Sequence, residues 1–197
     1  MHEILPHRAK DFPVGVNPVD KALYLQIKCR IYRQQSGGTL DSIANLGVSV
    51  SGQIGAPLMA LKQVASKYEK SSAVAGLLWD DCRREEQIVA TLLFANDMSV
   101  NDILTLLPLA CSIEVCEYAG SQWLSNQSCV DELFSVAFDS SNEKVVAALI
   151  SAAARREMMA ERGMCAPSPI VKKYILRRYD NAILEAMAER YRFKYAE

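Results

Sequence analysis

The sequence lacks long apolar runs. No stretch reaches the roughly 18 consecutive apolar residues that suggest a membrane-spanning helix, although half of the 197 residues are hydrophobic. The N-terminal stretch MHEILPHRAKDFPVG has no apolar core, because proline and charged residues interrupt it, so it does not read as a secretory signal. These absences predict a cytoplasmic protein with no membrane partner.

Metal ligands are scarce and not clustered. The only histidines, His2 and His7, lie in segment 1–17, which we expect to be a loose leader. The six cysteines form no CxxC pair: Cys29, Cys82, Cys111, Cys116, Cys129 and Cys165. Without a secretory signal, cysteines are read as reduced thiols that serve mainly as small core residues. We therefore predict no metal site and no cofactor.

Catalytic and nucleotide-binding motifs are also missing. The sequence contains no P-loop, no HExxH, no GxSxG and no dinucleotide fingerprint. The glycine-rich segment GVSVSGQIG, residues 47–55, could cradle a phosphate before the following helix, since free N–H groups there favour anions. A plain turn between two helices is the more common meaning of such a segment.

What the sequence does contain is helical periodicity, with a capping box at Ser99–Asp102 and a helix-ending glycine at Gly163. The predicted helices cover about 18–35, 39–46, 56–69, 73–79, 83–96, 100–107, 110–124, 127–138, 142–162 and 169–194, the last as one helix or a pair. No convincing strand is present. The predicted fold class is all-α.

Short helices with a single apolar stripe can bury it only against their neighbours, as helix bundles and α-solenoids do. No repeat period is legible in the sequence, so periodicity alone leaves both architectures open. The length favours one domain spanning residues 1–197, with residues 168–197 as a basic C-terminal helix or helix pair.

Charge is distributed unevenly along the chain. The net charge is −1, yet the segment from Arg155 to Lys194 holds ten basic and five acidic residues, a surplus of +5. Such an asymmetry points to a nucleic acid or another acidic partner at the C-terminal end. A solvated basic helix face would give the same pattern.

Two carboxylates and two tryptophans remain as candidates for chemistry. Glu114 and Glu117 are three residues apart, so they project from neighbouring positions of one helix. A carboxylate of this kind can act as a base, a nucleophile or a stabiliser of positive charge, although most such pairs are simply solvated. Trp79 and Trp123 are more typical of core anchors than of ligand platforms.

Three segments resemble motifs of the DNA alkylation repair family, the AlkD-like glycosylases. Leu78-Trp79 followed by Arg84–Ala90 is similar to the family's "LW … hEarlLA" signature, and Gly47-Val48 with the helix from Leu58 resembles its "GV … lR.la" entry. Ser112–Gly120 falls where the family has its "W..cD" segment. The resemblance covers roughly residues 20–160.

This resemblance implies an α-solenoid of stacked antiparallel HEAT-like helix pairs with a concave basic face that holds duplex DNA. It also implies hydrolysis of the N-glycosidic bond of cationic N3- or N7-alkylated purines, in which a carboxylate stabilises the charge developing on the sugar. The family's catalytic Asp falls on Glu117, its Trp on Ile113 and a later Arg near Val146. The candidate phosphate-binding cations are Arg155, Arg156, Lys172, Lys173, Arg177 and Arg178.

Two functions follow as alternatives. The chain is either a DNA alkylation repair-like glycosylase with Glu117 as its electrostatic group, or a non-catalytic helical-repeat module that binds protein or nucleic acid. A plain regulatory helical bundle is a third, blander alternative. Basic residues lining one concave face with Glu117 at its floor would favour DNA, and basic residues scattered outward would favour the binding module.

Overall fold

The computed structural model describes residues 16–45 and 53–192, and every regular element in these ranges is a helix. The all-α prediction is therefore confirmed for the described part of the chain. In chain order the elements are α1 (Pro18–Tyr32), α2 (Gly37–Asn45), α3 (Leu58–Ala65), α4 (Ser72–Trp79), α5 (Arg84–Leu93), α6 (Val100–Leu106), η1 (Leu107–Leu109), α7 (Ile113–Gln122), η2 (Leu124–Asn126), α8 (Val130–Val136), α9 (Glu143–Glu161), α10 (Pro169–Leu176) and α11 (Ala182–Arg192).

Most predicted helices occur close to their predicted bounds, and the differences lie at their ends. The helix expected over 83–96 ends at Leu93 as α5, because Phe94 adopts an extended ψ of 140°. The C-terminal segment forms a pair, α10 and α11, since the backbone at Arg177 is extended as well. The leader residues 1–15 and most of the predicted loop 47–55 lie outside the described residues.

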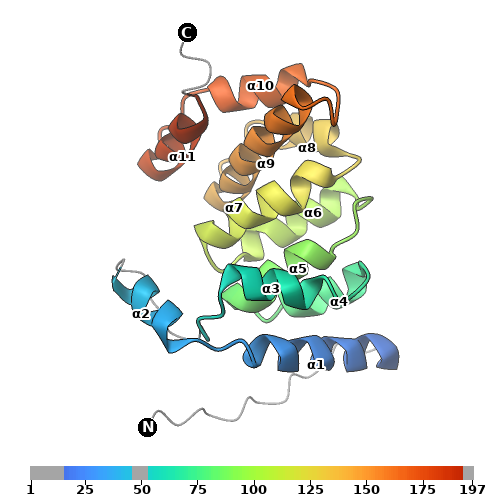
Figure 1. Cartoon of the computed structure of the whole chain (residues 1–197). Helices are drawn as coiled ribbons and strands as arrows, with labels where there is room; N and C mark the ends of the chain where they lie inside the picture. Colours follow the sequence, from blue (N-terminus) through green and yellow to red (C-terminus); the bar gives the residue numbers. More distant parts are fainter. Residues whose placement is uncertain (1–15, 46–52, 193–197) are drawn as a thin grey trace.

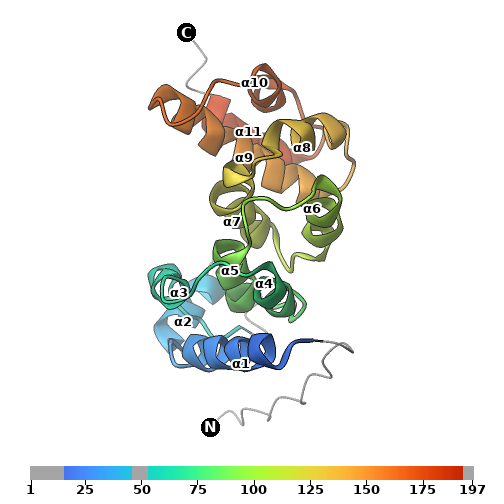
Figure 2. The ribbon, with the colours of Figure 1, turned by 90° about the vertical axis from the view of Figure 1, so that its right-hand side faces the viewer.

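The helices stack from α1 at one end of the molecule to α10 at the other (Figure 1). Turning the molecule by 90° shows that α5 lies between α3 and α4, and that α6 and α8 lie across from α7 and α9 (Figure 2). Helix α11 lies beside α9 at the side of the stack. None of the described helices has both the length and the apolar character needed to cross a membrane.

Local signals explain where the helices begin and end. Ser99 caps α6, because its hydroxyl accepts from the Asp102 N–H, and the same hydroxyl donates to the Asp102 carboxylate at 2.7 Å. Asn142 caps α9 in a similar way by accepting from the backbone N–H of Lys144 and Val145. Gly163 has a φ of +69° just after α9, which is the left-handed conformation expected of a helix-ending glycine.

The centre of the core is an aromatic cluster. Trp79, Phe94 and Trp123 are fully buried, with ring centroids 4.3 Å apart for Phe94 and Trp123 and 5.9 Å apart for Trp79 and Phe94. The indole N–H of Trp79 donates to the carbonyl of Leu106 at 2.9 Å, which ties α4 to the end of α6. The prediction that both tryptophans are core anchors is confirmed.

The closest helix contact is the crossing of α7 over α9 at Gly120. A Cβ placed on Gly120 would lie 2.0 Å from the carbonyl oxygen of Ala148 and 2.9 Å from the backbone nitrogen of Ala152. Both alanines are fully buried, so small side chains on each helix allow the two backbones to approach. A larger residue at 120 would force the two helices apart.

We expect Gly120→Ala to lower the free energy of unfolding by about 2 kcal/mol or more, because the added methyl group meets backbone atoms that cannot rotate away. Chemical denaturation of the native and substituted proteins measures this difference. The matched control is Gly76→Ala within α4, where an added Cβ meets nothing within 4 Å. That substitution should raise stability by about 0.5 kcal/mol. Equal effects at the two positions would contradict the role given to the crossing.

Candidate binding cleft and a buried polar network

An open cleft lies between α7 and α11. Its volume is about 510 Å³, and its lining is mainly apolar: Ile113, Glu117, Ala182, Ile183, Ala186, Met187 and Arg190. Ile183 is 61 % exposed, so its aliphatic side chain is open to solvent beside the cleft. Small alanines alternate with larger side chains along α11, so a second element could approach this helix closely.

Glu117, the predicted catalytic residue, lies in this cleft. Its side chain is 31 % exposed, and a carboxylate oxygen accepts from the Arg190 guanidinium of α11 at 2.5 Å. Ile113, at the position of the family's tryptophan, lines the same cleft. Val146, at the position of the family's arginine, instead lies on α9 and is buried in the core. The structure therefore brings together two of the three positions that the resemblance singles out.

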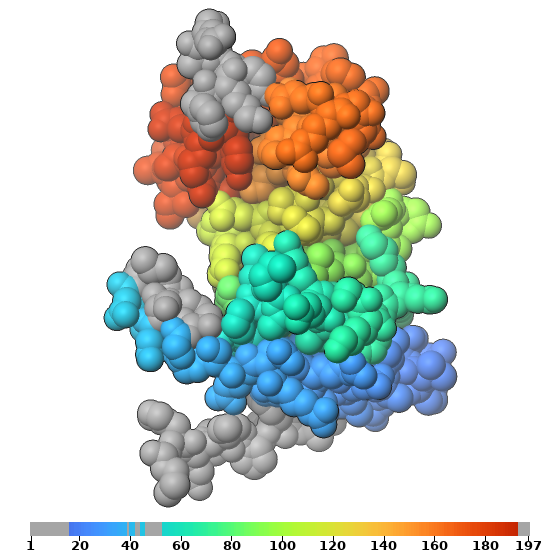
Figure 3. Space-filling view, in the orientation of Figure 1, coloured from blue at the N-terminus to red at the C-terminus, as the bar shows by residue number. Residues whose placement is uncertain are grey.

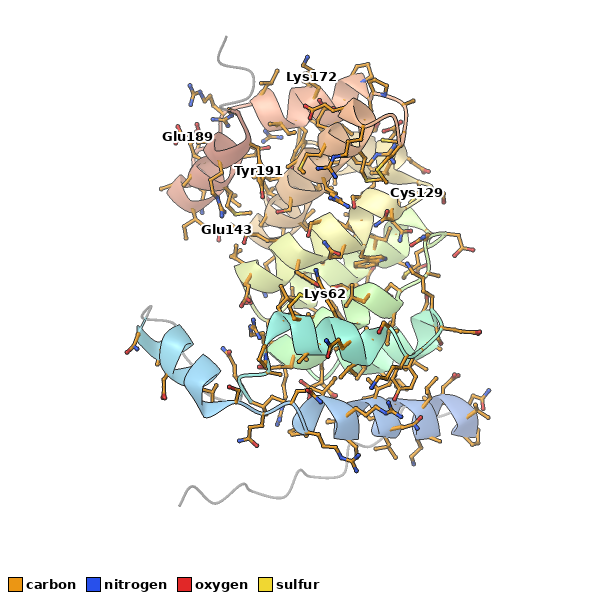
Figure 4. The ribbon with its side chains drawn as sticks, in the orientation of Figure 1. Lys62, Cys129, Glu143, Lys172, Glu189 and Tyr191 are labelled. Atoms are coloured by element: carbon orange, nitrogen blue, oxygen red, sulfur yellow. The ribbon has the colours of Figure 1, made fainter. Side chains whose placement is uncertain are left out.

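The predicted phosphate-binding cations do not surround Glu117. Arg155 and Arg156 lie in the second half of α9, away from the helix start at Glu143. Lys172 lies on α10 at the end of the stack, whereas Glu143 lies beside α11 (Figure 4). Lys173 is on the same helix as Lys172, and its ammonium nitrogen lies 5.1 Å from the centre of the Phe138 ring. These four cations thus belong to the upper end of the stack.

The remaining two predicted cations are engaged within the fold. Arg177 lies over the rings of Phe138, Tyr174 and Tyr179 at 5.2, 5.3 and 4.9 Å, and it donates to the carbonyl of Phe138. This arrangement ties α8 to α10 by cation–π contacts. Arg178 is exposed and pairs with Glu185 of α11 at 2.6 Å.

The side of the molecule between α2 and α11 is hollowed, as the space-filling view shows (Figure 3).

Two acidic residues in first helical turns, Glu114 of α7 and Glu143 of α9, are exposed. Acidic residues at a helix start stabilise the positive end of the helix dipole. Because these helix starts already carry carboxylates, they do not offer free sites for phosphate.

A buried polar network that was not predicted joins α1 to the turn between α4 and α5. The Tyr24 hydroxyl donates to the Asp81 carboxylate at 2.7 Å, and the Lys28 ammonium contacts the same carboxylate at 3.0 Å. Arg83 donates to the Tyr32 hydroxyl at 2.6 Å. Burial, reinforced by the hydrogen bond to Asp81, raises the pKa of Tyr24, so this hydroxyl keeps its proton and acts as a donor.

Glu86 is the least compensated member of this network. Its side chain is almost fully buried, and neither carboxylate oxygen has a well-aligned hydrogen-bond partner among the described residues. Burial raises the pKa of Glu86, and the neighbouring Asp81 raises it further, while Lys28 and Arg83 act in the opposite direction. Glu86 in turn contributes to the raised pKa of Tyr32, after burial. Glu86 therefore keeps its proton to a higher pH than a solvated glutamate does.

Two further buried charges hold neighbouring segments against α5. Arg84 makes a two-pronged contact with Glu114 of α7, with distances of 2.9 and 2.6 Å. Burial lowers the pKa of Arg84, but the bonds to Glu114 outweigh it and leave the pKa raised. Glu85 accepts from the backbone N–H of Gly55 at 3.1 Å. The N–H of Gly55, one of those that the glycine-rich segment could have offered to a phosphate, is therefore already bound by a carboxylate.

One sequence signal could have indicated the network. Tyr24, Lys28 and Tyr32 are spaced four residues apart, so they form one polar stripe along α1. Nine of the ten residues of α5 are buried, including the three charged residues at its start, Arg84, Glu85 and Glu86. No group of His, Cys, Asp and Glu within the described ranges is arranged to hold a metal ion, and His2 and His7 lie outside those ranges.

No known protein family, curated protein or solved structure matches this chain. The resemblance to the DNA alkylation repair family therefore stays a prediction from the quoted motifs.

Glu86→Gln should stabilise the protein at neutral and alkaline pH by about 1 kcal/mol, because a neutral amide avoids the burial of a charge. Since the folded-state pKa of Glu86 is raised, the unfolded chain releases this proton at lower pH than the folded protein does. Stability of the native protein should therefore fall as pH rises from the ordinary glutamate pKa to the raised one. Thermal unfolding of both proteins from about pH 4, near the ordinary glutamate pKa, upward to about pH 8 tests this.

The matched control is Glu69→Gln, since Glu69 is an exposed carboxylate between α3 and α4. It should leave both the stability and its pH dependence nearly unchanged. A constant difference between the native protein and Glu86→Gln at every pH would show that Glu86 does not titrate differently in the folded state.

Proposed function

We propose that this chain is a non-catalytic helical-repeat module that binds a segment of a partner protein in the cleft between α7 and α11. The repeats in this proposal are the consecutive pairs α4–α5, α6–α7 and α8–α9, stacked as a short HEAT-like solenoid. The order of the helices along the stack and the two-sided arrangement of α6 and α8 across from α7 and α9 support this architecture.

The observation that carries the binding proposal is the composition of the cleft. Ile113, Ile183 and Met187 give it an apolar floor, and Glu117 with Arg190 gives it a polar edge. An amphipathic helix fits such a surface, because its apolar side chains can enter the groove while its polar side chains meet the ion pair. Burying one aliphatic side chain contributes about 1.5–3 kcal/mol, so losing a single such contact should weaken binding by about 10-fold or more.

The arrangement of the cations favours protein over DNA as the partner. Arg177 and Arg178 are already engaged by aromatic rings and carboxylates, and Lys172 lies at the far end of the stack. A DNA-binding surface needs several cations along one face to displace counterions from the phosphates. The cleft itself presents one arginine, and that arginine is paired with Glu117.

Ile183→Glu should abolish partner binding and leave the fold intact, because the side chain is 61 % exposed in the unbound protein. Affinity purification with quantitative mass spectrometry should recover proteins with the native chain that are depleted at least about 10-fold with Ile183→Glu. The matched control is Val19→Glu on α1, where another exposed aliphatic residue lies outside the cleft. Equal recovery with all three proteins would exclude the cleft as the binding surface.

The glycosylase alternative predicts a different outcome. Among the residues that the structure describes, no aromatic ring lines the cleft to contact a cationic sugar, and Arg190 neutralises Glu117. We therefore expect no release of 7-methylguanine or 3-methyladenine from methylated duplex DNA beyond a buffer blank. Release that Glu117→Gln eliminates would overturn the binding-module proposal and support a repair enzyme of the family that the sequence resembles.

A further inference from the structure

Two exposed cysteines lie at neighbouring turns of the stack. Cys82 is in the turn between α4 and α5, and Cys111 is in the segment between η1 and α7. Both thiols are free and exposed, whereas Cys116, one turn further into α7, is fully buried. Only Cys82 and Cys111 of these three therefore meet a dissolved oxidant directly.

The buried side chain of Gln87 holds the two turns together. Its amide nitrogen donates to the carbonyl of Trp79 at 2.9 Å and to that of Leu109 at 3.0 Å. Its amide oxygen accepts from the backbone N–H of Cys111 at 2.7 Å. The N–H of Cys82 donates to the same Trp79 carbonyl at 3.1 Å. Both cysteines are thus fixed by their own backbone N–H groups to one hydrogen-bonded unit.

The backbone at Cys82 is itself unusual. Its φ is +51°, and it is the one residue other than glycine with a positive φ in the described ranges. Residues that carry a side chain rarely adopt this backbone conformation, and they keep it only where the surrounding structure enforces it. The thiol is therefore presented from a fixed turn and not from a freely rotating segment.

Cys82 also contributes to the electrostatic environment of Cys111. Cys111 is exposed as a residue, but partial burial of its thiol raises the pKa of Cys111, and Cys82 raises it further. A raised pKa slows attack by the Cys111 thiolate at neutral pH, so reaction should begin at the exposed Cys82. Cys111 then acts as the second thiol, which resolves the mixed disulfide.

We propose that Cys82 and Cys111 form an oxidation-sensitive pair that closes to a disulfide between the α4–α5 turn and the start of α7. With oxidised glutathione, the Cys82 thiolate attacks one sulfur of the oxidant and releases one glutathione thiolate. The Cys111 thiolate then attacks the Cys82 sulfur of the mixed disulfide and releases the second glutathione. The two protein thiols lose two protons and two electrons, and the oxidant is reduced to two molecules of glutathione.

The bond would close a loop of chain that contains α5, α6 and η1. It would also fix the start of α7, which carries two residues of the cleft, Ile113 and Glu117. The pair itself does not depend on the proposed binding function, since its evidence comes from the turns and from Gln87. Closing a loop of this size should raise the midpoint of thermal unfolding by several degrees.

The test uses the full-length protein, incubated with oxidised glutathione at mildly alkaline pH so that a larger fraction of both thiols is ionised. Digestion without reductant, followed by mass spectrometry, should identify a peptide pair joined through Cys82 and Cys111. Thermal unfolding of the oxidised and reduced protein should show the shift. Cys82→Ser and Cys111→Ser should each remove both the joined peptides and the shift.

The matched control is Cys29→Ser, because Cys29 is also exposed but lies on α1. It should leave the joined peptides and the thermal shift unchanged. Stable, separate glutathione adducts on Cys82 and Cys111, or a disulfide from either one to another cysteine, would overturn the proposal. An unchanged unfolding midpoint despite the joined peptides would overturn the structural consequence.

Discussion

The contact between α7 and α9 at Gly120 is the constraint on which the rest of the stack depends. The missing side chain at 120 lets the backbone of α7 approach the carbonyl of Ala148, and the buried alanines of α9 keep this approach possible along the helix. Other elements are positioned from these two helices. Arg84 fixes α5 to α7 through Glu114, and Asn181 fixes the start of α11 to α9 through Glu143 at 2.7 Å. The shape of the cleft therefore follows from a helix spacing set by one glycine.

The start of α5 shows how the fold manages charges inside a stack. A helix surrounded on all sides cannot direct its polar residues to solvent, so Arg84 and Glu85 find partners on other segments. The ion pair between Arg84 and Glu114 contributes little net stability, because the Glu114 side chain is 54 % exposed. The buried charges do require specific partners. This requirement selects one arrangement of three other parts of the chain around α5, namely α1, α7 and the segment before α3. Glu86 is the exception, since its partners only partly offset its burial.

The sequence was sufficient to predict the helices, because helical periodicity, the Ser99 cap and Gly163 are local signals. The burial of the charged residues of α5 was not predicted. Its charged residues are adjacent in the chain, and only the tertiary packing of α1 and α7 determines that they are buried. The same limit applies to the site. The position of Glu117 on α7 followed from spacing, but its pairing with Arg190 joins residues far apart in the sequence. The cations of α10 likewise gave a surplus of charge without indicating that Arg177 would be enclosed by aromatic rings.

The aromatic cluster has a spectroscopic consequence. The chain contains two tryptophans, and both lie in the cluster formed with Phe94, with the two indole centroids 6.1 Å apart. Intrinsic tryptophan fluorescence therefore reports mainly on the middle of the stack around this cluster. Circular dichroism, by contrast, weights every helix by its length. Unfolding curves from the two signals coincide only if the peripheral helices separate in the same cooperative step as the centre.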